Sequence, residues 1–464
     1  MKGSSFTPQQ RRIILYLILI VVVVFGLLAG FLVTSLQSLE PAPVVTPSPP
    51  PPTTPPPTTS SPTPTETPVP REGFWPQVRA ARLFDQIAHQ VETRRALVPQ
   101  AEVPLSFLSE HQMEEILRSY HADDDPQSRL LPYSILGLLP DELGVVQAQT
   151  PAGVYLSEQK QLYVAIDRSE DDPDTQALLA HAYVHALQDQ HFDLEGLRAR
   201  AQTTDEKLAL EALIEGDATL VTGLYRSEDL SSVDWDQLTD LIVEAEQPRY
   251  GGALADDETW NELRRFPSRE GRKFVAAVVE HEGWDSLNRS YTNPPLSTEQ
   301  ILHPSRYLGD SPRGEPDQPS AVHVPDLAPV LGSEWQPILE DTLGEFAVGL
   351  YLSQAMPQEA AWRRADGWDG DTLRVWEREN GRRVVVWRTM WDTASEAQEF
   401  ERGITLLIPQ HYVPVRPFDA PRALLGQWWE TPSGTVHARR DGRYLLFVRA
   451  PDTNTVVNAL GRLP

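Results

Sequence analysis

The sequence predicts a membrane anchor and a disordered stalk, followed by a mainly helical α+β domain and a smaller C-terminal α+β domain. Three observations predict this organisation. An uninterrupted apolar run fills residues 13–36, a tract of proline and threonine follows it, and the hydrophobic periodicity changes near residue 331. A length of 464 residues agrees with more than one folded domain.

The first 36 residues have the composition of a membrane anchor. Residues 1–12 contain Lys2, Arg11 and Arg12, and residues 13–36 exceed the roughly 20 apolar residues that cross a bilayer. The positive-inside rule places residues 1–12 in the cytoplasm and the rest of the chain outside it. A cleaved signal peptide is the rival interpretation, but its apolar region is usually only about 7–15 residues long. We therefore expect a single-pass protein of the cell membrane that contacts lipid through residues 13–36.

Residues 37–70 are expected to form a disordered linker. Most of this stretch reads "PAPVVTPSPPPPTTPPPTTSSPTPTETPVP", which offers almost no side chain for a hydrophobic core. Such a tract adopts extended polyproline-like conformations that rise about 3 Å per residue. The linker would hold the folded part of the chain away from the membrane.

Composition also excludes several classes of function. The chain has no cysteine, so disulfides, thiolate metal ligands and cysteine nucleophiles are absent. Its formal net charge is -26, whereas a nucleic-acid partner requires clustered lysine and arginine. We therefore expect no nucleic-acid partner.

The folded part divides by pattern into residues 71–330 and residues 331–464. Helical periodicity dominates the first segment, apart from a predicted hairpin at 153–167. In the second segment, hairpins are predicted around Asn380-Gly381 and Asp441-Gly442, because these dipeptides favour two-residue turns. Helical patterns accompany these hairpins, so we expect a small sheet covered on one face by helices.

The stretch "DDPDTQALLAHAYVHALQDQ" predicts a helix with two histidines on one face. Asp172 suits the N-cap and Pro173 the first helical position. His181 and His185 are four residues apart, so both imidazoles can reach one metal ion. With 11 histidines in the chain, chance alone gives roughly 0.26 such pairs, so the pair by itself is weak support for a site. Packed or exposed histidines on an ordinary amphipathic helix remain the alternative.

Glu215 supplies a third candidate ligand. It lies in "TTDEKLALEALIEGDATLV", a predicted helix that Thr203 and Glu206 open with a capping box. The surroundings of Glu215 are apolar, and a carboxylate buried there requires a partner such as a cation. Two histidines and one glutamate would hold Zn²⁺ and leave one coordination position open. An ion pair or a solvent-facing position is the alternative for Glu215.

The segments "HAYVHALQDQHFDL" and "ALIEGDATL" resemble gluzincin-type zinc metallopeptidases, in particular a group of exported or anchored bacterial proteins. The resemblance covers roughly residues 75–330, and "STEQILHPSRYL" and "GWDGDTLRVW" also resemble parts of that group. It implies a zincin-like domain with Zn²⁺ as the cofactor. The implied metal ligands are His181, His185 and Glu215. Asp189 and Asp217 would orient the imidazoles, His303 and Tyr307 would donate hydrogen bonds to an oxyanion, and the 153–167 hairpin would offer an edge strand to a peptide.

Ala182 departs from the pattern of that family. A glutamate at this position transfers protons between the attacking water and the leaving amine, and alanine cannot transfer them. The leading hypothesis is therefore a zinc-binding pseudo-peptidase that has lost efficient hydrolysis, with a peptide or protein as the ligand of its cleft. The alternatives are an active zinc hydrolase with a base from elsewhere, such as His303, and a structural or adhesive ectodomain without metal.

Overall fold

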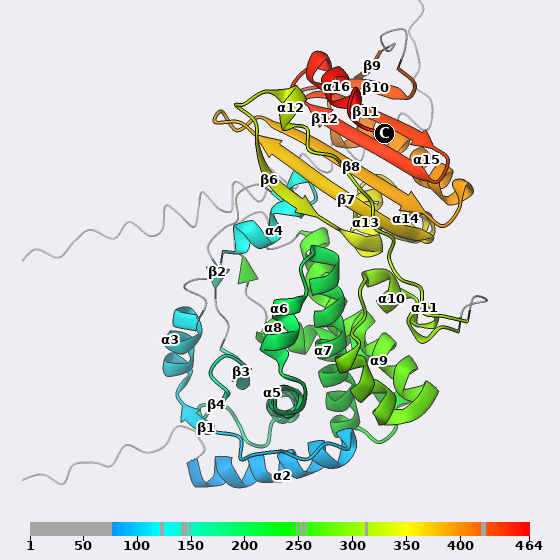
Figure 1. The fold of residues 1–464 in the computed structure, drawn as a ribbon. Helices are drawn as coiled ribbons and strands as arrows, with labels where there is room; N and C mark the ends of the chain where they lie inside the picture. Colours follow the sequence, from blue (N-terminus) through cyan, green and yellow to red (C-terminus); the bar gives the residue numbers. More distant parts are fainter. Residues whose placement is uncertain are drawn as a thin grey trace, which may run out of the picture. The chain divides into compact units, whose positions relative to one another are not determined.

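The structure, a computed structural model, describes residues 77–120, 125–140, 146–147, 150–246, 249–250, 254, 257–310, 314–418 and 424–464 (Figure 1). The chain divides into two units, residues 1–68 and residues 69–464, and every described residue belongs to the second unit. No helix in the described part is long and apolar enough to cross a membrane. The predicted anchor at 13–36 and linker at 37–70 lie outside the described residues.

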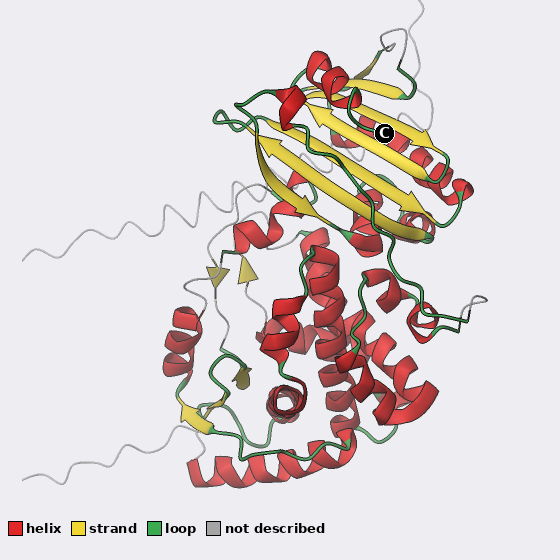
Figure 2. Cartoon of the chain, viewed as in Figure 1, coloured by secondary structure: helices red, strands yellow, loops and turns green. Residues whose placement is uncertain are grey.

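The fold is mixed α+β, with helices in the first part of the chain and one large sheet in the second (Figure 2). The helices of the first part are α2 (Gln77–Arg95), α3 (Glu110–Tyr120), α4 (Pro126–Ile135), α5 (Pro173–Phe192), α6 (Leu194–Arg200), α7 (Thr204–Arg226), α8 (Trp235–Glu246), α9 (Glu258–Thr292), α10 (Thr298–Leu302), α11 (Pro304–Leu308) and α12 (Ala328–Leu331). A short 3-10 turn, η2 (Leu230–Ser232), precedes α8.

Helices α5 and α7 begin where their capping residues predict. Asp172 accepts a hydrogen bond from the backbone N–H of Thr175, and Pro173 occupies the first turn of α5. Thr203 and Glu206 form the predicted capping box at the start of α7. Both predictions are confirmed, because a cap depends only on neighbouring residues.

Two glycines allow α7 and α9 to approach closely. A Cβ built on Gly216 would lie 2.2 Å from the backbone of Gly271, and one built on Gly271 would lie 1.9 Å from the carbonyl oxygen of Ala212. Side chains at these positions would therefore push the two helices apart. Since Gly216 follows Glu215, this close crossing holds Glu215 against the centre of the helical part.

A small sheet flanks α5 with strand order β1-β4-β3. Strands β3 (Gly153–Leu156) and β4 (Gln161–Ala165) form the predicted hairpin, so that prediction is confirmed. Strand β1 (Leu105–Leu108) pairs in parallel with β4. Strand β3 lies at the edge of this sheet and contacts α5. A separate two-stranded pairing joins β2 (Val146–Gln147) to β5 (Arg249–Tyr250).

The second part of the chain forms a seven-stranded antiparallel sheet with order β6-β7-β8-β12-β11-β10-β9. Its elements in chain order are β6 (Gln336–Asp341), α13 (Gly344–Ser353), α14 (Gln358–Ala365), β7 (Trp368–Glu377), β8 (Arg383–Trp391), α15 (Ala394–His411), β9 (Arg416–Pro417), β10 (Gln427–Thr431), β11 (Gly434–Asp441), β12 (Tyr444–Ala450) and α16 (Thr453–Leu460). The hairpins predicted around Asn380-Gly381 and Asp441-Gly442 are confirmed as β7–β8 and β11–β12.

Helices cover both faces of the large sheet, so the expectation of one covered face is wrong. One face packs against α13 and α15, and the other packs against α16 and the chain before β6. Successive strand residues point to opposite faces, and here both sets are apolar. The first face carries Leu373, Val375, Val385, Trp387, Leu445 and Phe447, and the second carries Trp376, Val384, Val386, Leu446 and Val448.

The helical part and the large sheet share one hydrophobic core. A single cluster of buried side chains includes residues of α7 and α9 together with residues of β7, β8 and α15. Hydrogen bonds also join the two parts, since Thr204 at the start of α7 donates its backbone N–H to Asp341 at the end of β6. The segments expected as separate domains at 71–330 and 331–464 therefore pack as one unit.

Candidate metal centre

Four side chains from three helices converge in the helical part. They are His181 and His185 of α5, Glu215 of α7 and Glu246 of α8, and one ligand atom from each lies within 4.8 Å of the other three. His181 is fully buried and His185 nearly so. The two glutamate side chains are about one-sixth exposed, at 17% and 16%. These four residues could hold a metal ion.

The spacing of the ligand atoms fits one tetrahedral ion. The two imidazole Nε2 atoms are 3.1 Å apart, and His181 Nε2 lies 3.4 Å from Glu215 and 3.3 Å from Glu246. His185 Nε2 lies 3.6 Å from Glu215 and 3.9 Å from Glu246. Ligand atoms about 2.1 Å from a tetrahedral zinc ion are about 3.4 Å from one another. The set of two nitrogens and two carboxylates also suits zinc chemistry.

Hydrogen bonds on the far side of each ring direct both Nε2 atoms toward the centre. His185 Nδ1 lies 2.9 Å from the Gln188 side-chain oxygen, which can only accept, so Nδ1 carries the proton. His181 Nδ1 lies 3.2 Å from the Thr222 hydroxyl oxygen, and that hydroxyl donates its own proton to the Ala218 carbonyl. His181 Nδ1 must therefore donate as well. Each ring therefore directs Nε2 toward the centre, where Nε2 can take either a proton or a metal ion.

The electrostatics of the four residues favour a cation at the centre. Burial by itself lowers the pKa of His181, but the carboxylates of Glu246 and Glu215 outweigh burial and raise that pKa to about 10. Burial raises the pKa of Glu215, but His185, His181 and Arg198 together hold it well below its ordinary value. A proton on His181 thus balances the carboxylates in the metal-free protein, and a divalent ion would replace that proton.

A buried chain of hydrogen bonds extends from His185 to Arg95. The Gln188 amide nitrogen donates to the Ile214 carbonyl and to the Tyr291 hydroxyl, which fixes the orientation of the amide. Tyr291 donates to Asp217, and the single N–H of Arg95 Nε is shared between the two oxygens of the Asp217 carboxylate. Asp217 was expected to orient an imidazole directly, but it acts on His185 through Tyr291 and Gln188.

Ala182 lies in an apolar environment. It is fully buried in the cluster of side chains between α5 and the small sheet. A Cβ built on Gly153 of β3 would lie 3.7 Å from the Ala182 Cβ, so the methyl group faces the start of this strand. Position 182 supplies no acid or base to the centre.

Asp189 does not contact either imidazole. Its carboxylate accepts hydrogen bonds from the Tyr155 hydroxyl and the Lys160 ammonium group of the β3–β4 hairpin, and from the Leu194 backbone N–H. Asp189 lies in the last turn of α5. Because its side-chain partners belong to the β3–β4 hairpin, Asp189 connects the hairpin to the end of α5.

His303 and Tyr307 do not belong to the four converging residues. Their side chains contact other parts of the chain and not the metal centre at which they were expected to donate hydrogen bonds to an oxyanion. His303 Nε2 is 3.0 Å from Glu345 of α13. The Tyr307 hydroxyl donates to the backbone carbonyl of Asn293. The "STEQILHPSRYL" segment contacts the large sheet's helices, because α10 packs against α13 as well as α7.

Glu246 was not found from the sequence, although one signal was present. Leu238 and Ile242 of α8 are buried and precede Glu246 by eight and four residues. Residues at this spacing lie on one helix face. A carboxylate in line with buried apolar side chains requires a partner, and that reasoning would have marked Glu246.

Comparison with known proteins identifies only part of the chain. The family model "Domain of unknown function (DUF8575)" matches residues 336–460, which run from the first residue of β6 to the last residue of α16. No curated protein and no solved structure matches the chain.

Proposed function

We propose that the chain is a zinc-binding, gluzincin-like protein that does not hydrolyse peptides efficiently. The observation that carries the proposal is the convergence of His181, His185, Glu215 and Glu246 within 4.8 Å. His181, His185 and Glu215 match the ligands of the resembled family, and both imidazoles present Nε2 to one point. When bound, the zinc ion would act as a Lewis acid.

Two features argue against efficient hydrolysis. Position 182 has only a buried methyl group, so the proton transfers of the resembled peptidases lack their usual carboxylate. Glu246 lies as close to His181 Nε2 as Glu215 does, and it would complete a four-ligand shell. Structural zinc sites have four protein ligands, whereas catalytic sites keep one position open.

Metal analysis of the purified full-length chain tests this proposal. We expect the His181 centre to bind one equivalent of zinc at sub-micromolar affinity, and we expect combined His181→Ala and His185→Ala changes to lower the bound zinc by that one equivalent. Less than about a tenth of an equivalent in the parent protein would contradict the proposal. Glu246→Gln should weaken zinc binding by at least about tenfold if Glu246 is a ligand.

An active hydrolase is the second candidate, because Glu246 offers a carboxylate near the metal ligands. Its oxygen lies 3.3 Å from His181 Nε2, so Glu246 replaces His303 as the candidate for the missing base. Peptidase turnover by the unchanged chain, abolished by His185→Ala and by Glu246→Gln, would favour this candidate. Turnover that appears only after Ala182→Glu would favour the pseudo-peptidase.

A peptide or protein is the proposed ligand of the chain. Strand β3 is at the edge of its sheet and begins beside Ala182, so an extended peptide could pair with it.

Residues 13–36 would anchor the chain in the cell membrane with residues 77–464 outside the cytoplasm. Protease added to intact cells should then remove the C-terminal part, and protection from the protease would contradict this topology. A structural ectodomain without metal would show no change in thermal stability with zinc or chelator.

A further inference from the structure

A second cluster of ligand-type side chains lies where α10 meets the large sheet's helices. His303 follows α10, Glu345 lies in the first turn of α13, and Asp366 follows α14. One ligand atom from each lies within 4.8 Å of the other two. None of these residues belongs to the His181 centre.

The distances in this cluster suit direct coordination of one ion. His303 Nε2 lies 3.0 Å from Glu345 Oε1 and 3.7 Å from Asp366 Oδ1. Ligand atoms about 2.1 Å from one ion are about 3.0–3.4 Å apart in octahedral or tetrahedral geometry. A shift of a few tenths of an ångström at Asp366, whose side chain is 58% exposed, would complete the fit.

Glu345 has an oxygen without a partner. The residue is 2% exposed, and Glu345 Oε2 has no hydrogen-bond partner in the part of the chain that the structure describes. The other oxygen of the same carboxylate contacts His303, so the unpartnered oxygen belongs to a group that already takes part in this cluster. A buried carboxylate oxygen without a partner is costly, and a bound ion is one explanation for it.

The charges around the cluster are also unbalanced. Arg306 pairs with Glu299 and lies 3.2 Å from Asp366 and 3.5 Å from Asp392. Glu299 and Glu345 are each 2% exposed. In the described residues, Arg306 and His303 are the two cations that contact a set of four carboxylates, Glu299, Glu345, Asp366 and Asp392. A divalent cation would supply the missing positive charge.

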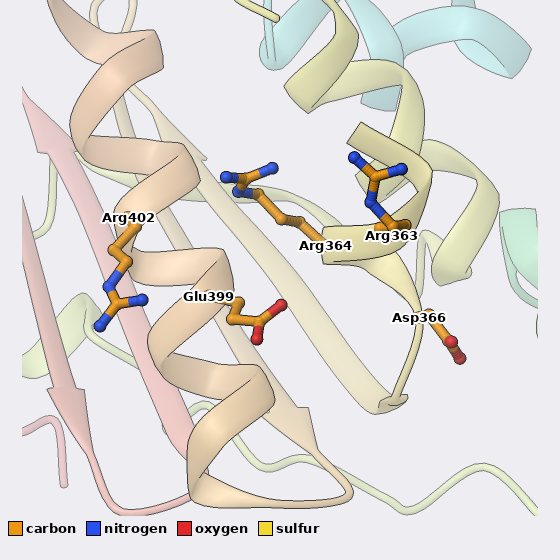
Figure 3. Close-up of a pocket in the computed structure, with 5 residues that line it drawn as sticks. All are labelled: Arg363, Arg364, Asp366, Glu399 and Arg402. Atoms are coloured by element: carbon orange, nitrogen blue, oxygen red, sulfur yellow. The ribbon is translucent and has the colours of Figure 1, made fainter. Parts of the chain in front are cut away.

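Asp366 is the most exposed of the three residues in the cluster. This residue borders a cavity of about 420 Å³ that is also lined by Arg363, Arg364, Glu399 and Arg402. Figure 3 shows the Asp366 carboxylate pointing away from the guanidinium groups of Arg364 and Arg402. The cation that contacts this carboxylate is Arg306, which is not among the residues that line the cavity.

We propose that His303, Glu345 and Asp366 bind a second divalent transition-metal ion, such as Zn²⁺ or Mn²⁺. An imidazole ligand favours these ions over Ca²⁺ and Mg²⁺, which take oxygen ligands. The ion would connect the end of α10 to α13 and to the loop after α14. It would therefore fasten the helical part of the chain to the sheet that the family model matches.

Counting bound Zn²⁺ in the full-length chain tests the second site separately from the first. After combined His181→Ala and His185→Ala changes, equilibrium dialysis at micromolar Zn²⁺ should still find one equivalent. Adding Asp366→Asn should lower the remaining affinity at least about tenfold, and adding His303→Ala should remove it. His111→Ala is the matched control, because His111 forms only an exposed pair with Glu115.

Two results would overturn the second site. One is no bound Zn²⁺ after the His181→Ala and His185→Ala changes, provided that circular dichroism shows a folded protein. The other is a retained equivalent that survives both Asp366→Asn and His303→Ala. If the double histidine variant does not fold, Asp366→Asn in the parent chain decides, because this exposed position tolerates substitution. The parent should then bind two equivalents, and the variant should bind one of them at least about tenfold more weakly. Equal affinities for both equivalents in the two proteins would contradict the site.

Discussion

The helical part and the seven-stranded sheet bury very different side chains. The sheet buries tryptophans, and Trp368, Trp376, Trp387 and Trp391 are among the largest side chains that are fully buried. The helical part has an apolar core of its own and in addition buries polar and charged groups, among them Arg95, His181, Gln188, Asp217 and Thr222. Buried polar groups cost stability unless each has a partner, whereas buried tryptophans contribute it.

This difference indicates that the two parts contribute differently to one folded unit. Apolar burial in the sheet stabilises the unit, and this stability offsets the cost of the buried ligands and hydrogen-bond partners in the helical part. Side chains of both parts join one core, so stability gained in the sheet is available to the metal centre. The following changes test whether stability and metal binding separate in this way.

Trp387→Ala should give the largest loss of stability while leaving zinc affinity unchanged. Trp387 is fully buried and its ring contacts Tyr351 and Phe400 edge to face. Truncation of such a side chain costs about 3–5 kcal/mol of unfolding free energy. Denaturant unfolding and zinc titration of the folded fraction would measure the two effects. A tenfold change in zinc affinity would contradict the separation of stability from metal binding. Trp387→Phe is the control and should lose less stability.

Asp217→Ala should lower both stability and zinc affinity. It would leave Arg95 buried without its carboxylate partner, which typically costs about 3–5 kcal/mol. It would also release Tyr291 and thereby Gln188, the residue that orients His185, so zinc affinity should fall about tenfold or more. Glu430→Ala is the matched control, because it breaks the exposed pair with Arg416 and should cost under about 1 kcal/mol. Unchanged zinc affinity in Asp217→Ala would show that Asp217 does not act on His185 through Tyr291 and Gln188.

Gly216→Ala should have a smaller effect of about 1–3 kcal/mol. The added methyl group would meet the Gly271 backbone and move α7 relative to α9, and with α7 the ligand Glu215. Thermal unfolding measures the loss, and zinc affinity should fall with it. Gly461→Ala has a nearest contact at 3.3 Å, against 2.2 Å for Gly216→Ala, and should therefore cost less stability. An equal effect of both substitutions would contradict the close crossing.

Asp205→Asn should give the smallest effect, seen as a change in pH dependence. Burial raises the pKa of Asp205 to about 8, and the charges of Asp371 and Glu345 also raise it, against hydrogen bonds from Thr298. The folded pKa exceeds the ordinary value of 3.8, so this group's contribution is complete below about pH 4 and is lost as pH rises through about 8.

Asparagine keeps the oxygen that accepts from Thr298 but cannot ionise. The fall in unfolding free energy between pH 5 and pH 9 should therefore shrink by at least about 1 kcal/mol in Asp205→Asn. Urea unfolding at several pH values, with chelator present, would measure it. A variant whose pH profile matches that of the parent would contradict the buried, proton-binding state of Asp205.

Local sequence by itself determined the elements that carry the first site. Caps at Asp172 and Thr203 begin α5 and α7, and a spacing of four residues puts His181 and His185 on one face, because these effects act within a helical turn. The turns at Asn380-Gly381 and Asp441-Gly442 are local for the same reason. The apolar surroundings of Glu215 were visible in its own helix.

Only the tertiary structure decided which distant residues meet. Glu246 joins the histidines because α8 packs against α5 and α7, and Tyr291 reaches Gln188 from α9. His303 meets Glu345 and not His181, since α10 lies against α13. Such contacts depend on how helices and sheets pack over long separations in the chain, and no spacing rule in the sequence encodes that packing.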